Sequence, residues 1–434
     1  MTPDTCLKIA KTAGHLLSNK NIKKNRVIIS KDTRLSSYIF EPLMTSGLVS
    51  MGMDVILTGP LPTPALSMLI ISLRADMGVM ITASHNTYEY NGLKFFDSTG
   101  NKISKELENQ IENIVLNEDN YNKIPTKGLK TGTATRFDDT VGRYSEYLKL
   151  SIERNQNFKN IKVVLDCANG ATYQIAPTIF WELGCNVISI NNKPNGKNIN
   201  DKCGAVNVEQ LSKKVLDSKS DIGFAFDGDG DRLIIVDEKG HTIDGDRILA
   251  LLSKELINNN TLNKKTVVST VMSNLGFENY LKNILDVKLI RTAVGDINVI
   301  EEMKKNSLSL GGEQSGHIIF GKYSKTGDGI LTSLKILEIL KKSKIKTSKL
   351  FNIYDSYPQE KINIPLNGKL KNDLIDKINN LSFDCKKKKP HLRYVIRESG
   401  TEFLLRILVE GKNEEEVKKE INNLSNNIKA IINV

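Results

Sequence analysis

The chain has 434 residues, of which 39% are hydrophobic and 26% charged, and at roughly 100–200 residues per domain this composition predicts several globular domains. The net charge of +11 is spread along the chain, and its one dense run, residues 386–389, has no interleaved aromatic residues, which argues against a nucleic-acid partner. Five scattered cysteines, no signal-peptide pattern and no apolar run near 18 residues predict reduced thiols, a cytoplasmic location and no membrane partner.

A strand–helix–strand pattern occurs three times along the chain. Each copy begins with a short β-branched run, continues through a turn and a helix-length stretch, and ends in a second strand. The predicted first strands lie at residues 26–30, 161–166 and 266–270, and the second strands at 54–57, 186–190 and 287–290. Three copies predict three related α/β domains rather than one large sheet.

Breaks in composition divide the chain further. A Gly/Thr/Lys connector, a turn and a Lys/Ser/Thr stretch lie at residues 128–135, 237–240 and 343–348. Beyond the last break, two short strands and a terminal helix over 413–432 predict a separate α+β domain. We therefore predict domains over residues 1–134, 135–238, 239–348 and 349–434.

Ser84 and His85 follow the apolar run 77–81, which predicts a strand. Ligands of open α/β sheets bind at such strand ends. The G-x-S-x-G elbow of serine hydrolases is absent. This motif alone leaves a reactive serine and an ordinary loop serine equally open.

Three carboxylates alternate with glycines in Asp227-Gly-Asp229-Gly-Asp231-Arg232. They can converge on one hard cation only if the backbone bends sharply, which the glycines permit. An EF-hand loop requires a glycine where Arg232 stands and helices where the flanks predict strands. The segment therefore favours a magnesium site over an EF-hand or a solvated acidic turn.

Glu313, Ser315 and His317 lie in a glycine-containing loop after a predicted strand at 308–310. A carboxylate, a hydroxyl and an imidazole on one loop can bind sugar hydroxyls. The same segment is also compatible with a simple turn.

Residues 397–402 combine a guanidinium, hydroxyls and a glycine, and Arg406 follows. Arginine donates a forked pair of hydrogen bonds, and a glycine lets backbone N–H groups approach an anion. The segment predicts a phosphate site, with a hairpin turn carrying a surface arginine as the alternative.

Each predicted domain thus carries one of the parts that phosphoryl transfer needs: a hydroxyl, a metal site, a sugar-binding loop and a phosphate site. The chain resembles the α-D-phosphohexomutase family over essentially its whole length. The matching segments are residues 82–86, 227–232, 312–317 and 397–402, in the family's order and spacing. The resemblance implies a heart-shaped architecture of three mixed-sheet α/β domains and a C-terminal α+β domain.

The resemblance also implies roles by position. Ser84 would be a phosphoserine and would hold Mg²⁺ together with Asp227, Asp229 and Asp231. The implied catalytic residues are Ser84, His85, Lys94, Arg232 and His317, with Lys94 as the candidate general acid/base. The implied substrate-binding residues are Glu313 and Ser315 for sugar hydroxyls, and Arg397, Ser399, Gly400, Thr401 and Arg406 for phosphate.

The implied reaction interconverts glucosamine 6-phosphate and glucosamine 1-phosphate, for the supply of UDP-N-acetylglucosamine. It passes through phospho-Ser84 and a bisphosphate intermediate, with a sugar 1,6-bisphosphate as activator. Gln314 and the segments 31–36, 59–64, 199–205 and 326–329 indicate the glucosamine branch. A branch acting on mannose or glucose phosphates and a non-catalytic sugar-phosphate binder stay open, and a homodimer is the candidate assembly.

The chain departs from the family pattern in two places. Met1 aligns with the start of the family's first helix, so we expect the first domain to lack the opening strand and its active-site arginine. Two explanations of this difference are favoured: the start of the chain was assigned too late, or the chain was shortened. An impaired enzyme is less favoured, because the later motifs are intact. In the phosphate loop, Glu398 adds a negative charge and Phe403 replaces a usual proline.

Overall fold

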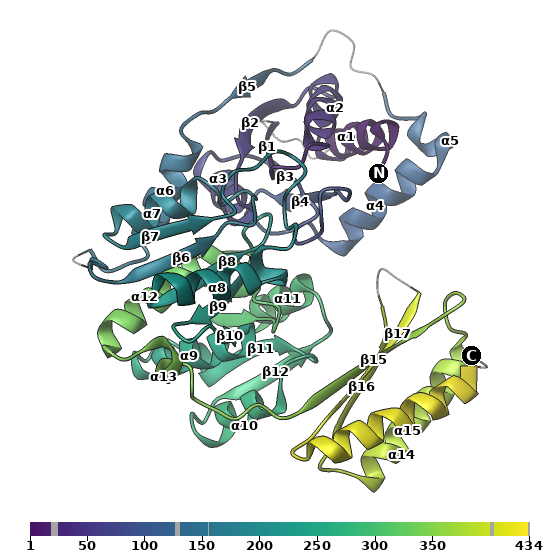
Figure 1. Ribbon diagram of the computed structural model, residues 1–434. Helices are drawn as coiled ribbons and strands as arrows, with labels where there is room; N and C mark the ends of the chain where they lie inside the picture. The colour runs from purple at the N-terminus through teal and green to yellow at the C-terminus, as the bar shows by residue number, and fades with distance from the viewer. Residues whose placement is uncertain (19–24, 126–130, 155, 400–402, 433–434) are drawn as a thin grey trace.

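The computed structural model describes residues 1–18, 25–125, 131–154, 156–399 and 403–432. Its strands form four sheets of five, five, four and three strands. Figure 1 shows the first three sheets following one another from the purple N-terminal part to the green central part, with the yellow C-terminal unit to one side. In the described ranges, no helix has the length and apolar character that crossing a bilayer requires.

The first sheet consists of β1 (Arg26–Lys31), β2 (Asp54–Pro60), β3 (Met77–Ile81), β4 (Leu93–Asp97) and β5 (Ala134–Arg136), in the order β4-β3-β1-β2-β5. Its helices are α1 (Pro3–Ser18), α2 (Ser37–Ser50), α3 (Thr63–Ser72), α4 (Lys105–Leu116) and α5 (Glu118–Tyr121). Every residue of β3 is buried, as are all but the first of β1. Burial on both faces is typical of parallel strands that helices cover on each side.

The second sheet consists of β6 (Lys162–Asp166), β7 (Asn186–Ile190), β8 (Ile222–Phe226), β9 (Leu233–Asp237) and β10 (Thr242–Ile243), in the order β10-β9-β8-β6-β7. Its helices are α6 (Thr140–Lys149), α7 (Ile175–Glu182), the 3₁₀ helix η1 (Gly204–Val206) and α8 (Glu209–Ser218). All residues of β8 and β9 are buried, so the connection between them is held rigidly at both ends.

The third sheet consists of β11 (Thr266–Thr270), β12 (Lys288–Thr292), β13 (Leu310–Gly312) and β14 (Ile318–Phe320), in the order β12-β11-β13-β14. The helices of this part of the chain are α9 (Gly245–Asn258), the 3₁₀ helix η2 (Asn263–Lys265), α10 (Leu275–Asn283), α11 (Asp296–Asn306), α12 (Gly329–Ser343) and α13 (Thr347–Leu350). Of these, α12 packs against β8 and β9 of the second sheet.

These three sheets repeat one strand arrangement. The orders β2-β1-β3-β4, β7-β6-β8-β9 and β12-β11-β13-β14 each contain three parallel strands followed by an antiparallel fourth. The predicted threefold repeat of an α/β unit is confirmed. In each copy the predicted motif lies in the connection that leads into the antiparallel strand.

The C-terminal unit consists of β15 (Gln359–Pro365), β16 (Arg393–Glu398) and β17 (Leu404–Glu410), with α14 (Asn372–Lys388) and α15 (Glu414–Ile432). Its sheet is antiparallel, in the order β15-β17-β16. Its apolar core is separate from the core that runs through the three α/β units. The prediction of an additional α+β domain is therefore confirmed.

One buried and one partly buried polar residue attach the C-terminal unit to the third α/β unit. Glu410 is fully buried, and its Oε1 accepts a hydrogen bond from the backbone N–H of Leu275 (2.7 Å). Arg393 pairs with Glu410 and donates to the carbonyls of Val271 (2.7 Å) and Ser273 (2.9 Å). These contacts set the direction in which the β16–β17 hairpin extends from the rest of the molecule (Figure 1).

Candidate active site

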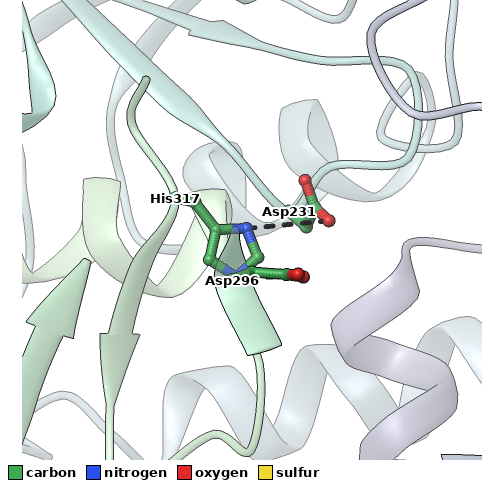
Figure 2. Close-up of side chains that lie close together, drawn as sticks. All are labelled: Asp231, Asp296 and His317. Atoms are coloured by element: carbon green, nitrogen blue, oxygen red, sulfur yellow. Dashed lines mark ion pairs between the residues drawn. The ribbon is translucent and has the colours of Figure 1, made fainter. Parts of the chain in front are cut away.

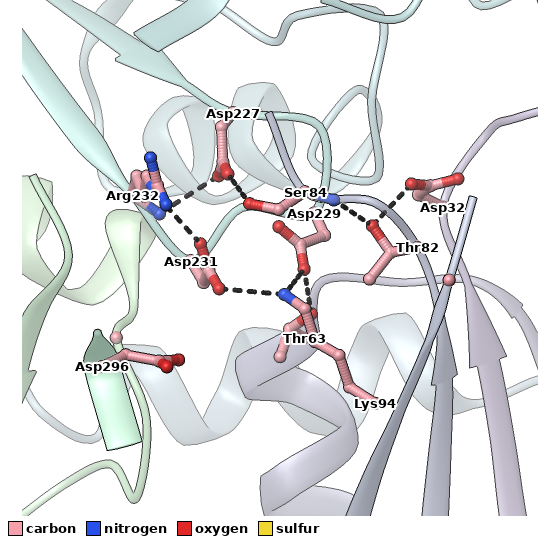
Figure 3. A network of polar contacts seen from close by, with 12 residues as sticks. Asp32, Thr63, Thr82, Ser84, Lys94, Asp227, Asp229, Asp231, Arg232 and Asp296 are labelled. Atoms are coloured by element: carbon pink, nitrogen blue, oxygen red, sulfur yellow. Dashed lines mark hydrogen bonds and ion pairs between the residues drawn. The ribbon is translucent and has the colours of Figure 1, made fainter. Parts of the chain in front are cut away.

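Ser84 lies in the β3–β4 connection and has a left-handed backbone conformation, with φ +50°. A residue with a Cβ adopts this conformation only at an energetic cost, which the surroundings must offset. Its N–H donates to Thr82 Oγ1 (2.9 Å), and its carbonyl accepts from Arg34 Nη2 (3.0 Å) and Asn200 Nδ2 (2.8 Å). The hydroxyl donates to Asp227 Oδ2 (2.7 Å), so the loop directs Ser84 into the aspartate loop (Figure 3).

Arg34 holds the backbone of the β3–β4 connection, which carries Ser84. It is fully buried and forms an ion pair with Asp32, between Nε and Oδ2 at 2.8 Å. Its guanidinium also donates to the carbonyls of Asn86 (2.8 Å) and Tyr90 (3.0 Å). Sequence reasoning used residues 31–36 only as a family marker and missed this role. The available signal was a pair of opposite charges two positions apart, directly after a buried strand.

The three aspartates lie in the β8–β9 connection, and all are buried. One carboxylate oxygen of each lies within 4.8 Å of the others, and Gly230 supplies the predicted bend with φ +71°. Asp229 Oδ1 and Asp231 Oδ1 are buried without a hydrogen-bond partner. Buried like charges repel, and orphaned carboxylate oxygens cost free energy. This donor set therefore fits a hard divalent cation such as Mg²⁺.

The surroundings shift the pKa values of Asp227 and Asp231 in opposite directions. Burial, followed by the charges of Asp231 and Asp229, raises the pKa of Asp227 well above its ordinary value. Burial alone would also raise the pKa of Asp231, but Lys94 and His317 hold it well below the ordinary value. A neutralising cation beside Asp227 would favour its ionised form.

Lys94 reaches the aspartate loop from β4 in the neighbouring unit. Its Nζ donates to Asp229 Oδ2 (2.6 Å) and Asp231 Oδ2 (3.3 Å), and Thr63 Oγ1 donates to the same Asp229 oxygen (2.5 Å). Burial alone would lower the pKa of Lys94, but Asp229 and Asp231 raise it above its ordinary value. This arrangement favours the ammonium form. An ammonium group can donate a proton but cannot accept one.

His85 lies close enough to Arg232 for the guanidinium charge to act on its imidazole. Burial, together with the charge of Arg232, lowers the pKa of His85 to about 4, which favours the neutral imidazole. His85 Nδ1 is buried without a hydrogen-bond partner. The backbone N–H of Arg232 donates to Asp227 Oδ1 (3.1 Å), and its Nε lies 4.0 Å from Asp231 Oδ1.

The predicted sugar-binding loop connects β13 to β14. The strand is Leu310–Gly312 rather than residues 308–310, so Gly311 and Gly312 belong to the strand. A Cβ on Gly312 would lie 2.5 Å from the carbonyl oxygen of His317, and this close approach explains the glycine. Glu313 is buried and accepts the N–H of Gly295 (3.1 Å), whereas Ser315 is exposed.

His317 lies between two carboxylates (Figure 2). Its Nδ1 is 3.7 Å from Asp231 Oδ2, and its Nε2 is 3.9 Å from Asp296 Oδ2. The backbone N–H of Gly327 donates to Nε2 (2.9 Å), which assigns the proton of the neutral ring to Nδ1, facing Asp231. Asp296 was not predicted from sequence, because nothing local marks the first residue of α11 as part of this site.

The predicted phosphate site lies on the β16–β17 hairpin. Arg397 and Arg406 are direct cross-strand partners, which places two guanidinium groups side by side. Burial and the charge of Arg406 lower the pKa of Arg397, as expected where positive charges are crowded. Ser399 donates its N–H to the carbonyl of Leu404 (2.8 Å). The predicted phosphate ligands Gly400 and Thr401 lie outside the described residues.

The side chain of Glu398 is held by a backbone hydrogen bond. One of its carboxylate oxygens accepts the N–H of Leu370 (3.1 Å) in the connection before α14. Phe403 is 64% exposed.

Comparison with known families gives a consistent assignment. Models described as "Phosphoglucomutase/phosphomannomutase, alpha/beta/alpha domain" I, II and III match residues 1–122, 142–240 and 244–357. A protein of Thermodesulfovibrio yellowstonii named phosphoglucosamine mutase is 45% identical and aligns over 98% of this chain and 94% of its own length. A protein of Aliarcobacter butzleri with the same name is 44% identical, over 97% and 94%.

Solved structures show the same fold. A phosphoglucomutase/phosphomannomutase family protein from Burkholderia thailandensis superposes with a TM-score of 0.84 at 23% identity, covering 99% of this chain and 94% of its own. An N-acetylphosphoglucosamine mutase from Aspergillus fumigatus, solved with GlcNAc-6P and magnesium, superposes with a TM-score of 0.65 at 19% identity, covering 85% and 92%.

Proposed function

The chain belongs to the phosphoglucomutase/phosphomannomutase family, and on that premise we propose that it acts as a phosphoglucosamine mutase. It would interconvert glucosamine 6-phosphate and glucosamine 1-phosphate. The relatives at 44% and 45% identity carry that name. Within the site, the proposal is carried by the contact of 2.7 Å between Ser84 Oγ and Asp227 Oδ2, which places a hydroxyl directly on a carboxylate group that fits a divalent cation.

The reaction consists of two phosphoryl transfers through Ser84. In the first, the Oγ–phosphorus bond of phospho-Ser84 breaks as a sugar hydroxyl oxygen bonds to phosphorus. The hydroxyl proton passes to a base, and Ser84 Oγ takes up a proton. The bisphosphate then turns over in the site, and its other phosphate returns to Ser84 by the same exchange of bonds. A sugar 1,6-bisphosphate would load Ser84 at the start.

We assign two tasks to the groups around Ser84: stabilising the negative charge of the transferred phosphoryl group and transferring protons. Mg²⁺ held by the three aspartates would withdraw negative charge from the transferred phosphoryl group. Lys94, as an ammonium group, stabilises the same charge and is the candidate donor of a proton to the leaving oxygen. His85 is neutral, and its buried Nδ1 makes it the group we assign to accept a proton.

The remaining loops hold the sugar. Glu313 is fixed by the N–H of Gly295, and we assign it to the sugar hydroxyls. Arg397 and Arg406 present two adjacent guanidinium groups for the phosphate that does not react. Because either phosphate of the bisphosphate can occupy this site, the same phosphate site serves both transfers.

A substrate comparison tests the assignment. Purified protein with Mg²⁺ and a catalytic amount of glucose 1,6-bisphosphate is given glucosamine 6-phosphate, glucose 6-phosphate or mannose 6-phosphate, and the products are followed by phosphorus NMR. We expect the highest kcat/KM for glucosamine 6-phosphate. Preferred turnover of mannose or glucose phosphate would assign the chain to another branch of the family. Binding without turnover, with Ser84 shown to be phosphorylated, would indicate a non-catalytic binder.

A further inference from the structure

Lys102 and Asp296 form an ion pair between the first and third α/β units. Lys102 Nζ donates to Asp296 Oδ2, and the two residues lie 194 positions apart in the sequence. Their side chains are 20% and 22% exposed, so the pair is largely shielded from solvent. Shielded pairs are less screened by salt than surface pairs. The proposed reaction assigns no role to either residue.

Asp296 belongs to the segment that supports the sugar-binding loop. It is the first residue of α11, and the preceding residue, Gly295, donates its N–H to Glu313 Oε1 (3.1 Å). Asp296 Oδ2 also lies 3.9 Å from His317 Nε2, at the other end of that loop. A shift of the α11 N-terminus would therefore shift Glu313 and His317.

Lys102 belongs to the segment that supports Ser84 and Lys94. It forms an antiparallel bridge to Phe96 in β4, two residues after Lys94. Flanking backbone hydrogen bonds, from Asp97 N–H to the carbonyl of Asn101 (2.8 Å) and from Ile103 N–H to that of Phe95 (3.0 Å), hold this bridge. β4 in turn pairs with β3, which leads into the Ser84 loop.

A second metal site is the rival interpretation of this cluster, because Asp231, Asp296 and His317 also lie within 4.8 Å of one another. The hydrogen bonds argue against it. The N–H of Gly327 occupies the lone pair of His317 Nε2, which places the proton of the neutral ring on Nδ1, facing Asp231 (Figure 2). Neither ring nitrogen then offers a cation a free lone pair. Lys102 already neutralises Asp296.

We propose that the Lys102–Asp296 ion pair sets the position of the sugar-binding loop relative to the phosphoserine loop. Both residues are positioning residues. They act through Glu313, His317 and Lys94, and this inference rests on the proposed function. Displacement of reacting groups by about 1 Å can cost on the order of a hundredfold in rate. Loss of the pair should therefore lower kcat more than it raises KM.

A double-mutant cycle tests this proposal on the full chain. Lys102→Met and Asp296→Asn are each expected to lower kcat by about 10- to 100-fold, with KM changed by less than about threefold. The double variant is expected to be no slower than the poorer single variant, because each change removes the same contact. Lys102→Arg keeps the charge and is expected to retain most of the rate. Lys265→Met breaks the exposed Lys265–Asp286 pair of the third unit and serves as the matched control.

Rates within twofold of the unmodified protein for both single variants, or effects that multiply in the double variant, would overturn the proposal. The same cycle is measured as thermal unfolding midpoints, which need no turnover. Non-additive midpoints are expected, and additive midpoints would show that the ion pair does not couple the two units. Failure of the unmodified chain to turn over any hexose phosphate would contradict the proposed function. The unfolding midpoints of the same variants would still show whether the ion pair couples the two units.

Discussion

Ser84 Oγ lies 2.7 Å from Asp227 Oδ2, although 143 positions separate the two residues in the chain. The contact joins the β3–β4 connection of the first sheet to the β8–β9 connection of the second. Because those connections are equivalent in the repeated unit, the contact follows from packing two copies of one fold against each other. It also joins the proposed cation site and the hydroxyl proposed to react into a single site.

Asp227→Asn should abolish the stabilisation of the fold by Mg²⁺. A cation that binds only the folded chain raises its unfolding midpoint, and Asp227 is one of three carboxylates that would hold it. Without Mg²⁺ the variant should be at least as stable as the unmodified chain, because one of three repelling buried carboxylates is gone. Thermal unfolding with and without Mg²⁺ measures both effects, with the exposed substitution Asp217→Asn as control. An undiminished Mg²⁺ shift in Asp227→Asn would contradict the metal assignment.

Arg34→Met should destabilise the chain by about 3–5 kcal/mol, because it leaves the buried carboxylate of Asp32 without its partner. It should also lower turnover strongly, since Arg34 fixes the carbonyl of Ser84. The double variant Asp32→Asn with Arg34→Met should be less destabilised than Arg34→Met alone. Urea unfolding measures the stabilities. A double variant less stable than the single one would show that the cost does not come from an unpaired charge.

Gly327→Ala should impair activity while costing only about 1–3 kcal/mol of stability. A Cβ at this position would lie 2.6 Å from the imidazole of His317 and 2.5 Å from the carbonyl oxygen of Asp231. The change should therefore displace Asp231, a proposed metal ligand, and its neighbour His317. Gly142→Ala in α6 is the control, because its Cβ meets only the exposed side chain of Asp139 and alanine favours a helix. Steady-state kinetics at saturating Mg²⁺ compare them, and equal activity would show that turnover does not depend on the close packing of Gly327 against His317 and Asp231.

Asp328 should make stability depend on pH in a defined window. It caps α12 and accepts the hydroxyl of Tyr144 (2.7 Å), and burial raises the pKa of its carboxyl from 3.8 to about 6. The folded chain thus retains a proton that the unfolded chain releases above about pH 4. This contribution, on the order of 3 kcal/mol, is complete below about pH 4 and is lost as the pH rises to about 6.

Urea unfolding of the unmodified chain and of Asp328→Asn at several pH values measures this effect. Between pH 4 and pH 6.5, the free energy of unfolding of the unmodified chain should fall by roughly 3 kcal/mol relative to that of Asp328→Asn. A difference that stays constant over this range would show that Asp328 does not titrate as proposed.

The repeated fold could be predicted from sequence because its signals are local. Short β-branched runs and following turns mark the strands of each unit, and the glycines around the aspartates mark a sharp bend. The segments around Ser84 and the three aspartates were correctly predicted to be loops. Gly311 and Gly312 instead belong to β13, and Arg397 and Glu398 belong to β16. Residues 400–402 lie outside the described residues. The boundaries at residues 134, 238 and 348, the cytoplasmic location and the homodimer stay predictions.

The supporting residues could not be predicted, because their partners are distant in the sequence. Arg34 acts on carbonyls about 50 positions away, and Asp296 meets Lys102 across 194 positions. Such residues carry no motif of their own. The pKa of Lys94 is a similar case, since it depends on carboxylates that another unit supplies.

The proposed reaction depends on Ser84 as the carrier of the phosphoryl group. The most direct measurement loads the protein with labelled phosphate from glucose 1,6-bisphosphate, locates the label by peptide mass spectrometry, and then adds glucosamine 6-phosphate with Mg²⁺. We predict that the label lies on Ser84, passes to the sugar at a rate at least equal to kcat, and that Ser84→Ala neither takes up label nor turns over substrate. Label on another residue, or turnover retained in Ser84→Ala, would contradict the account.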